Sequence, residues 1–251
     1  MRYERVTLKL SGQAVSGDEE FGFDHEALEH IADEVIGLHG RGVQVSVVIG
    51  GGNIFRGNLG SLWGIERAEA DNIGMMGTIV NSLMLRGVIT GRSEGNVEVR
   101  VMTAVPVNSV AEPYIRLRAA HHLEKGYVVI FAGGTGQPYV TTDYTAAQRA
   151  LETRSEALLY AKNQARGIFT ADPQTDPQAR LYRRMDYNTI LRQNLKVVDL
   201  PSVILARDND LPIHVFDFDE KGTILRICDG EDVGTLVGHV DEDELEDGKS
   251  A

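Results

Sequence analysis

Three consecutive glycines after an apolar run are the residues of this chain best suited to bind phosphate. The valines and isoleucine at positions 43–49 predict a buried strand, and Gly50–Gly52 follow it directly. Glycine lets backbone N–H groups approach an anion, and a helix N-terminus adds about half a positive charge. We expect Asn53 to cap a helix here, with Arg56 one turn further, where its guanidinium can form two hydrogen bonds to a phosphate.

Two other segments repeat this design. Residues 128–143 read VVIFAGGTGQPYVTTD, and the shorter LKLSG at 8–12 contains Lys9, whose ammonium can reach a phosphate above the turn. Each segment is an apolar strand followed by a turn rich in glycine, serine or threonine. Three such turns predict a nucleotide site that binds more than one phosphate group.

Several acidic side chains have two interpretations that the sequence leaves open. Asp71 precedes an apolar helix, where it can accept hydrogen bonds from ribose hydroxyls or cap the helix. Asp143 can orient a cation or cap its own helix, whereas Asp172 and Asp176 stand before prolines, as turn residues do. The histidines show no metal-ligand spacing, so we expect no metal site built from side chains.

The elements that must position these residues alternate between strands and helices. The opening strand–loop–helix–strand order favours a parallel sheet, and the two Asp-Pro steps at 172–177 predict a loop over 167–179. Apolar patterning predicts strands at 6–10, 43–49, 97–102, 127–131, 157–160, 212–216 and 235–237, and helices at 24–40, 68–86, 110–123, 141–151, 187–191, 199–209 and 222–228.

Composition limits the class of protein. The net charge of −12 argues against a nucleic-acid surface, but Lys9, Arg56 and Lys162 flank the candidate turns and supply local positive charge. We expect no membrane helix and no signal peptide, and the single cysteine favours a reducing cytoplasm. We predict one domain over 1–238, divided near 156, and a solvated, mobile acidic tail over 239–251.

Taken together, the motifs resemble those of the bacterial-type uridylate kinases of the amino acid kinase superfamily, over roughly residues 6–236. No single motif is specific, but the combination is. The motifs are KLSG at 9–12, GGGNIFRG at 50–57, Asp71 followed by IGMM at 73–76, AGGTGQPYVTTD at 132–143, GIFTADPQTDP at 167–177, LKVVDL at 195–200 and ILARDNDLPIHVF at 204–216.

The resemblance implies a three-layer αβα sandwich around a mainly parallel sheet, with an acceptor half at about 1–156 and an ATP half at about 157–238. It implies transfer of the γ-phosphoryl group from ATP to UMP, giving UDP and ADP in pyrimidine nucleotide biosynthesis, with Mg²⁺ carried on ATP. It further implies a homohexamer with GTP and UTP as effectors, while the charge and composition predict no nucleic-acid and no membrane partner.

The resemblance also implies the site residues. Catalysis would rest on Lys9, Arg56 and Asp143. The ATP site would comprise Lys9, Leu10, Ser11, Gly12, Gly52, Arg56, Asn163, Phe169 and Asp172. The UMP site would comprise Gly51, Asp71, Thr135, Gly136, Gln137, Pro138, Tyr139, Val140, Thr141 and Thr142. The loop linked to GTP activation would comprise Gly17, Asp18, Glu19, Glu20, Phe21 and Gly22.

Three positions depart from the family pattern. Gln13 and Gln137 stand where the family usually has glutamate and asparagine, and Arg166 replaces an aspartate near the expected ATP site. Two rival functions therefore stay open. One is a kinase of the same superfamily that forms an acyl phosphate, and the other is a regulator that binds nucleotides without catalysis.

Overall fold

The computed structural model describes residues 1–163, 165–173, 175–195 and 197–246. A single sheet runs through them in the order β10-β7-β9-β8-β6-β1-β2-β5-β3-β4. All pairs are parallel except β8 with β9 and β10 with β7. The strands are β1 Arg5–Leu10, β2 Gln44–Ile49, β3 Val99–Thr103, β4 Glu112–Pro113, β5 Val128–Ala132, β6 Ala157–Lys162, β7 Tyr182–Asp186, β8 Ile213–Asp217, β9 Thr235–Gly238 and β10 Glu244–Leu245.

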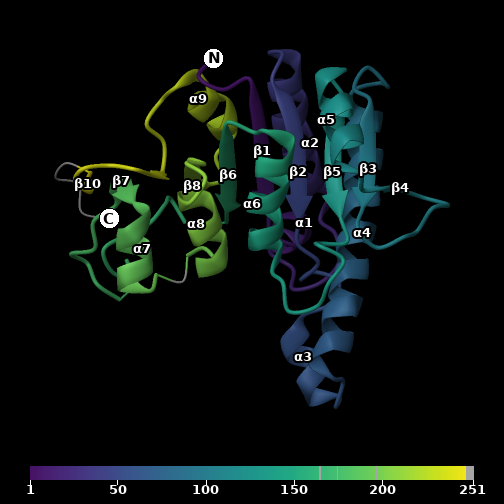
Figure 1. The fold of residues 1–251 in the computed structure, drawn as a ribbon, viewed down its shortest axis with the longest axis horizontal. Helices are drawn as coiled ribbons and strands as arrows, with labels where there is room; N and C mark the ends of the chain where they lie inside the picture. The colour runs from purple at the N-terminus through teal and green to yellow at the C-terminus, as the bar shows by residue number, and fades with distance from the viewer. Residues whose placement is uncertain (164, 174, 196, 247–251) are drawn as a thin grey trace.

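Helices cover both faces of this sheet (Figure 1). Helices α2, α4 and α9 pack together on one face, and α5, α6, α7 and α8 pack on the other. The helices are α1 Gln13–Ser16, α2 His25–Gly40, α3 Gly57–Leu62, α4 Arg67–Arg92, α5 Arg116–Glu124, α6 Thr142–Thr153, α7 Tyr187–Gln193, α8 Leu200–Arg207 and α9 Thr223–Asp229.

Alternating residues of the central strands divide the core into two layers. In β5, Val128 and Ile130 pack with the α2 and α4 layer, whereas Val129 and Phe131 pack with the α5 and α6 layer. Strands buried on both faces are typical of parallel sheets covered by helices. The predicted three-layer αβα sandwich with a mainly parallel sheet is therefore confirmed.

The strand order reverses direction beside β1. On one side of β1 lie β2, β5 and β3, with β5 inserted between the earlier strands β2 and β3, and the chain then places β6 and β8 on the other side of β1. In open α/β sheets, ligands bind outside the carboxyl ends of the strands at such a reversal. Lys9 lies near the carboxyl end of β1, and Lys162 is the last residue of β6.

Two local predictions are wrong. The helix predicted over 110–123 begins only at Arg116, because Pro113 lacks an N–H and Glu112–Pro113 instead form the edge strand β4 beside β3. Asn53 does not cap a helix: its side chain is buried in a turn, and α3 begins at Gly57, after Arg56. Strands β7 and β10 were not predicted.

The acidic tail is not wholly solvated. Asp243 accepts hydrogen bonds from the Asp186 backbone N–H at 2.7 Å and from the Thr189 hydroxyl at 2.7 Å, and Glu244 and Leu245 pair with β7. The prediction of a solvated tail is therefore wrong for Asp243, whereas the Glu244 side chain is 57% exposed. Positions 247–251 lie outside the described residues.

Helix α4 is long and apolar enough, by length and composition, to cross a membrane. It packs on α2, β3 and β5, and 44% of its apolar window is buried within the protein. Its inward face includes the polar residues Asn81 and Ser82, both fully buried. These contacts are those of a helix that forms part of the αβα layer.

Candidate active site

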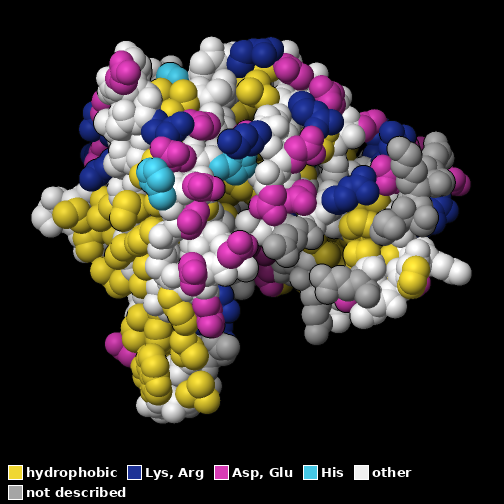
Figure 2. Space-filling view, turned by 180° about the vertical axis from the view of Figure 1, so that it is seen from behind, with side chains coloured by type: hydrophobic (Ala, Val, Ile, Leu, Met, Phe, Trp, Pro, Cys, Tyr) yellow, Lys and Arg dark blue, Asp and Glu magenta, His cyan; other side chains and the backbone are white. Residues whose placement is uncertain are grey.

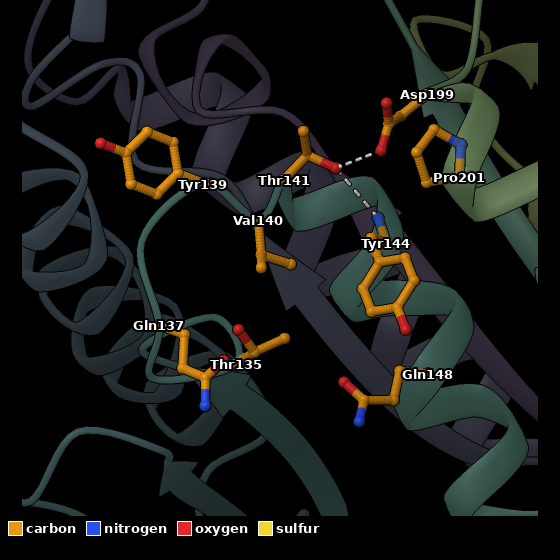
Figure 3. A pocket seen from close by; sticks show the side chains of 9 residues that line it. All are labelled: Thr135, Gln137, Tyr139, Val140, Thr141, Tyr144, Gln148, Asp199 and Pro201. Atoms are coloured by element: carbon orange, nitrogen blue, oxygen red, sulfur yellow. Dashed lines mark hydrogen bonds between the residues drawn. The ribbon is translucent and has the colours of Figure 1, made fainter. Parts of the chain in front are cut away.

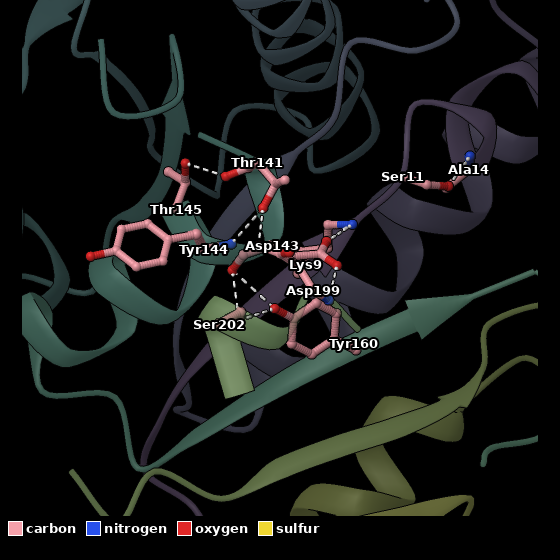
Figure 4. Close-up of polar contacts among 10 residues, drawn as sticks. All are labelled: Lys9, Ser11, Ala14, Thr141, Asp143, Tyr144, Thr145, Tyr160, Asp199 and Ser202. Carbon is pink, nitrogen blue, oxygen red and sulfur yellow. Dashed lines mark hydrogen bonds and ion pairs between the residues drawn. The ribbon is translucent and has the colours of Figure 1, made fainter. Parts of the chain in front are cut away.

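Two lysines and one aspartate meet at the carboxyl ends of β1 and β6. The Lys9 ammonium forms an ion pair with Oδ1 of Asp143, which stands in the first turn of α6, and both side chains are nearly buried (Figure 4). Lys162 lies close enough to interact electrostatically with both of them. This cluster combines two cations with one carboxylate, so it carries a net positive charge in an acidic protein.

The environment shifts the pKa of two members of the cluster. Burial would raise the pKa of the Asp143 carboxyl, but Lys9, together with Lys162 and the backbone N–H of Asp199, outweighs burial and holds that pKa below its usual value. Burial, followed by repulsion from Lys9, lowers the pKa of the Lys162 ammonium, and Asp143 opposes this change. Asp143 is thus ionised at neutral pH and available to a cation.

Hydrogen bonds fix the start of α6 beneath this cluster. The Tyr160 hydroxyl, fully buried on β6, and the Ser202 hydroxyl both donate to the backbone carbonyl of Asp143, at 2.9 and 3.0 Å (Figure 4). Thr141 caps α6 by accepting from the Tyr144 N–H, and its hydroxyl donates to Asp199 Oδ2 at 2.8 Å. The position of Asp143 is therefore set by backbone contacts as well as by its ion pair.

The first two glycine turns pack back to back. A Cβ on Gly12 would lie 2.5 Å from the Gly52 nitrogen, and a Cβ on Gly51 would lie 2.5 Å from the carbonyl oxygen of Gly74 in α4. None of the glycines at 50–52 has a positive φ. The need for glycine at position 51 therefore comes from the close approach of the Gly74 backbone. A Cβ on Gly52 would meet nothing within 4 Å, which leaves open space where an anion can approach the backbone.

Arg56 lies over the same turn, although no helix holds it. Its Nε donates to the Gly52 carbonyl oxygen at 3.3 Å. Its Nη1 lies 3.6 Å from Oε1 of Glu20, and its guanidinium carbon lies 5.9 Å from the centre of the Phe21 ring. The structure thus brings the turn of Gly50–Gly52 and the loop 17–22 together around one arginine.

Leu10 and Ser11 support the turn that follows β1. Leu10 ends β1 and is fully buried, and the Ser11 hydroxyl accepts from the Ala14 N–H at 3.2 Å (Figure 4). Both residues therefore support the turn that Gly12 completes.

The loop after β5 encloses a cavity of about 480 Å³ (Figure 3). Five predicted acceptor-site residues line it, namely Thr135, Gln137, Tyr139, Val140 and Thr141. Four further residues that were not predicted also line it, namely Tyr144, Gln148, Asp199 and Pro201. Tyr144 and Gln148 follow Thr141 at helical spacing, a signal present in the sequence. Asp199 directly precedes α8 and Pro201 lies in its first turn, and neither had a local signal.

Asp71 holds this loop against α4. Its Oδ2 accepts from the Tyr139 N–H at 2.8 Å, and its Oδ1 lies 2.9 Å from Nε of Arg67. Tyr139 adopts a φ of 65°, which is rare for an aromatic residue, and its ring lies 5.7 Å from the Arg67 guanidinium carbon. Asp71 does not cap α4, because Arg67 already precedes it in the helix.

Three other predicted acceptor residues, in the loop after β5 or at the start of α6, do not line the cavity. Gly136 has a φ of 80°, and a Cβ there would lie 3.2 Å from the Ala104 carbonyl oxygen, so the position favours glycine. Pro138 is half-buried, and Thr142 is the first residue of α6, beside Asp143.

The residues predicted for the nucleoside end of ATP are less closely grouped. Asn163 donates to Asp219 at 3.2 Å, and both line a cavity of about 160 Å³ together with Gly17 and Asp18 of the loop 17–22. Phe169 pairs with Leu181 through an isolated β-bridge. The carbonyl oxygen of Asp172 accepts from the Thr175 and Asp176 N–H groups, which closes a turn, and neither Phe169 nor Asp172 lines either of these two cavities.

Arg166, which stands where the family usually has an aspartate, has an acidic partner. Its Nη2 lies 3.4 Å from Oε1 of Glu246, and both residues line a separate cavity of about 240 Å³. The charge that replaces an aspartate is therefore compensated in part by the acidic tail. Because both side chains are partly exposed, this pair contributes little to stability.

Among the described residues, no group of three or more His, Cys, Asp or Glu side chains could hold a metal ion. Asp143 is the carboxylate of the lysine cluster, and its two oxygens already contact Lys9 and the Asp199 N–H. These residues suit a metal that arrives bound to nucleotide phosphates better than one held in a cage of side chains.

Comparisons with known proteins agree with this architecture. The model of the amino acid kinase family matches residues 4–217. Uridylate kinases from Frankia casuarinae and Rickettsia bellii are 53% and 44% identical to the chain over 236 and 237 residues. Each alignment covers 94% of this chain, and 90% and 98% of the respective relative.

Solved structures give the same result. The crystal structure of UMP kinase from Bacillus anthracis superposes with a TM-score of 0.94 at 56% identity, covering 98% of this chain and all of that one. UMP kinase from Ureaplasma parvum superposes with a TM-score of 0.88 at 33% identity, covering 95% of this chain and all of that one. With the fold, the glycine turns and the lysine cluster in place, the chain belongs to the amino acid kinase family and, within it, to the uridylate kinases.

Proposed function

We propose that this enzyme transfers the γ-phosphoryl group of ATP to UMP, giving UDP and ADP in pyrimidine nucleotide biosynthesis. The observation that carries the proposal is the cluster of Lys9, Asp143 and Lys162 at the reversal of strand order, where the turn that follows β1 packs against Gly52. Two cations close to glycine-rich turns suit a transferring phosphoryl group, whose charge must be stabilised on several oxygens at once.

The chain needs no general base for this reaction. The second pKa of a phosphate monoester is about 6, so the acceptor is mostly ionised at pH 7. The ammonium of Lys9 neutralises charge on the transferring group, Arg56 binds phosphate oxygens of ATP, and Asp143 orients Lys9. Catalysis then consists of alignment and charge stabilisation, which are the main requirements of phosphoryl transfer.

Mg²⁺ enters this scheme with ATP. The ion would be held largely by phosphate oxygens and water, with Asp143 as the nearest carboxylate of the cluster, and it neutralises phosphate charge when bound. The protein's own part is to hold Asp143 ionised and fixed at the start of α6.

The two substrates approach from opposite sides of the cluster. We assign the acceptor to the cavity beside the loop after β5, within the half formed by about 1–156; Asp71 holds that loop, and Gly51 packs against α4. We assign ATP to the turn of Gly12 and Gly52 and to Asn163, Phe169 and Asp172 of the half formed by about 157–238. The two halves meet where β1 pairs with β6.

An acceptor panel tests the proposal. ADP release is measured with ATP and Mg²⁺ in the presence of UMP, CMP, dTMP, carbamate or aspartate. We expect release that depends on UMP. Release that depends on carbamate or aspartate would instead support an acyl-phosphate-forming kinase, and nucleotide binding without release would support a regulator.

We further propose that the enzyme acts in the cytoplasm as a homohexamer. The outward face of α4 exposes Met76, Val80 and Met84 at helical spacing, each at least 40% exposed. Figure 2 shows hydrophobic side chains gathered along the projection that α3 and α4 form and on the body beside it. An apolar face of this kind suits burial against another subunit, and light scattering after size-exclusion chromatography measures the number of subunits.

We also propose that GTP and UTP regulate the enzyme, with the loop 17–22 taking part in the response to GTP. The contacts of Glu20 and Phe21 with Arg56 support this role, since the loop touches a proposed ATP ligand. Initial rates with either nucleotide added at fixed ATP and UMP measure the effect.

A further inference from the structure

Two buried amide side chains face each other between α4 and the Gly50–Gly52 turn. Asn53 and Asn81 are 1% and 0% exposed. Nδ2 of Asn81 donates to Oδ1 of Asn53 at 2.7 Å, and Nδ2 of Asn53 donates back to Oδ1 of Asn81 at 3.1 Å. The pair is reciprocal, so each amide satisfies one donor and one acceptor of the other.

The second donor of each amide binds a backbone carbonyl oxygen in a different segment. Asn81 donates to Gly50 at 2.6 Å, at the start of the glycine turn. Asn53 donates to Gly22 at 2.8 Å, at the end of the loop 17–22, and the Gly22 N–H donates to the Asn53 carbonyl oxygen at 2.9 Å. One buried network therefore joins α4, the glycine turn and the loop.

This network leaves the turn little freedom to move away from α4. The place of a Cβ on Gly51 is already taken by the Gly74 carbonyl oxygen at 2.5 Å, so the turn is pressed against the helix. One turn before Asn81, the Thr78 hydroxyl accepts from the Gly133 N–H at 2.8 Å, which anchors the turn after β5 to the same helix. Helix α4 thus supports the backbone on both sides of the proposed phosphate positions.

Losing either amide would leave several buried groups without partners. Without Asn81, three groups lose a hydrogen-bond partner. They are the Gly50 carbonyl oxygen and the Oδ1 and Nδ2 atoms of Asn53. Buried polar groups without partners are costly, and partly satisfied networks are the first to rearrange. The cheapest rearrangement moves Asn53, which also carries both hydrogen bonds to Gly22.

We propose that Asn81 is a positioning residue that, through Asn53, makes the glycine turn and the loop 17–22 a single cooperative unit. It touches no proposed substrate position and acts by fixing Gly50 and Asn53. The kinetic part of this inference rests on the proposed phosphoryl transfer. The structural part, that the loop undocks when the turn loosens, does not.

The test compares Asn81→Leu, which has similar volume but no polar atom, with Ser82→Ala. Ser82 is the next residue of α4 and equally buried, but its hydroxyl donates to Thr78 within the helix. Asn81→Ser, which keeps one hydroxyl donor, serves if Asn81→Leu does not fold. For each variant, kcat and the KM for ATP and UMP are measured below the unfolding temperature, and amide hydrogen exchange is measured at Gly22, Ile54 and Phe55.

We expect Asn81→Leu to lower kcat/KM for both nucleotides roughly 10- to 100-fold, with a smaller loss in Asn81→Ser, because small displacements of positioning groups cost rates of this order. Exchange should rise at least about 10-fold at Gly22, whose N–H binds Asn53, and at Ile54 and Phe55, whose N–H groups bind the Gly51 carbonyl oxygen. Ser82→Ala should change neither readout.

Kinetic constants and exchange that match Ser82→Ala, even with a lower melting temperature, would reduce Asn81 to a structural residue and overturn the proposal. Faster exchange at Ile54 and Phe55 with Gly22 unchanged would also overturn it, because the loop would then be independent of the turn. If the wild-type protein releases no ADP with any acceptor, the proposed function fails, while exchange at Gly22 still decides the coupling.

Discussion

The cluster of two lysines and one aspartate predicts that Asp143→Asn destabilises the protein more than Lys9→Met does. Lys9→Met leaves Asp143 with Lys162 as a remaining cation, so the site becomes neutral. Asp143→Asn leaves Lys9 and Lys162 together without a carboxylate, in a site where Lys9 is 7% exposed. Removing one partner of a buried ion pair is costly because the other charge stays buried without compensation.

The size of each loss in the free energy of unfolding depends on how deeply the ion pair is buried and on whether Lys162 compensates the remaining charge. Side chains 9% and 15% exposed place the Lys9–Asp143 pair near the buried limit, so Asp143→Asn should lower the free energy of unfolding by about 3 kcal/mol. Lys9→Met should cost about 1 kcal/mol, because Lys162 still compensates Asp143. The double variant should cost about 2 kcal/mol less than the sum of the single losses, as expected for directly coupled residues.

Urea unfolding at one fixed protein concentration measures these differences, provided that the dependence on urea is unchanged. Melting temperatures with and without pyrophosphate give a second readout. Because Asp143→Asn retains both lysines, pyrophosphate should raise its melting temperature more than that of the wild type. A greater loss in Lys9→Met than in Asp143→Asn, or additive losses within about 0.5 kcal/mol, would refute the reasoning.

Four other predictions follow from single positions. Lys9→Met should lower kcat by orders of magnitude in the ADP-release assay while circular dichroism stays native, and unchanged turnover would remove Lys9 from the mechanism. Gly12→Ala should not fold, because its Cβ would lie 2.5 Å from the Gly52 nitrogen, whereas Gly52→Ala should fold and raise the KM for ATP about 10-fold. Val80→Lys should reduce the number of subunits measured by light scattering, since it places charge on the exposed apolar face of α4. Burial, and next Arg2, lowers the pKa of His214 to about 3 from its ordinary 6.5, so the unfolded chain binds one more proton between these values. Between about pH 6.5 and about pH 3, His214 should then lower the free energy of unfolding by about 1.4 kcal/mol for each pH unit of acidification, a contribution that His214→Gln should lack.

Local patterns were enough to predict a mainly parallel sheet whose strands end in glycine-rich turns. Each central strand is a short apolar run ending in a turn, and the carboxyl ends of parallel strands meet at one edge of the sheet. Lys9 could therefore be assigned to the same edge as Gly50–Gly52 without knowledge of the strand order. The assignment needed only that the two strands be parallel, which the intervening helix indicates.

Contacts between distant segments could not be predicted in the same way. Asn53 resembles a helix cap in sequence, but Asn81, 28 positions later, determines its role by pairing with its amide. Asp199 approaches Asp143 across 56 positions, and β10 pairs with β7 from the far end of the chain. No periodicity or turn residue marks these partners, because the contacts exist only after the layers have packed.

Ion pairs between the cations of the site and nearby carboxylates explain how an acidic protein can bind an anion. Lys9 is neutralised by Asp143 and Arg56 lies beside Glu20, so each of these cations already has a carboxylate partner in the folded chain. A phosphate that binds Arg56 exchanges one anionic partner for another and need not bury a new charge. Charges beyond about 8 Å are largely screened at physiological ionic strength, so the acidic residues elsewhere on the surface oppose this exchange only weakly. The exchange is easier at Arg56, whose partner Glu20 is 64% exposed, than at Lys9, whose partner is held by hydrogen bonds at the start of α6. Arg56 therefore has the more replaceable partner, and the loop that carries Glu20 competes directly with phosphate for it.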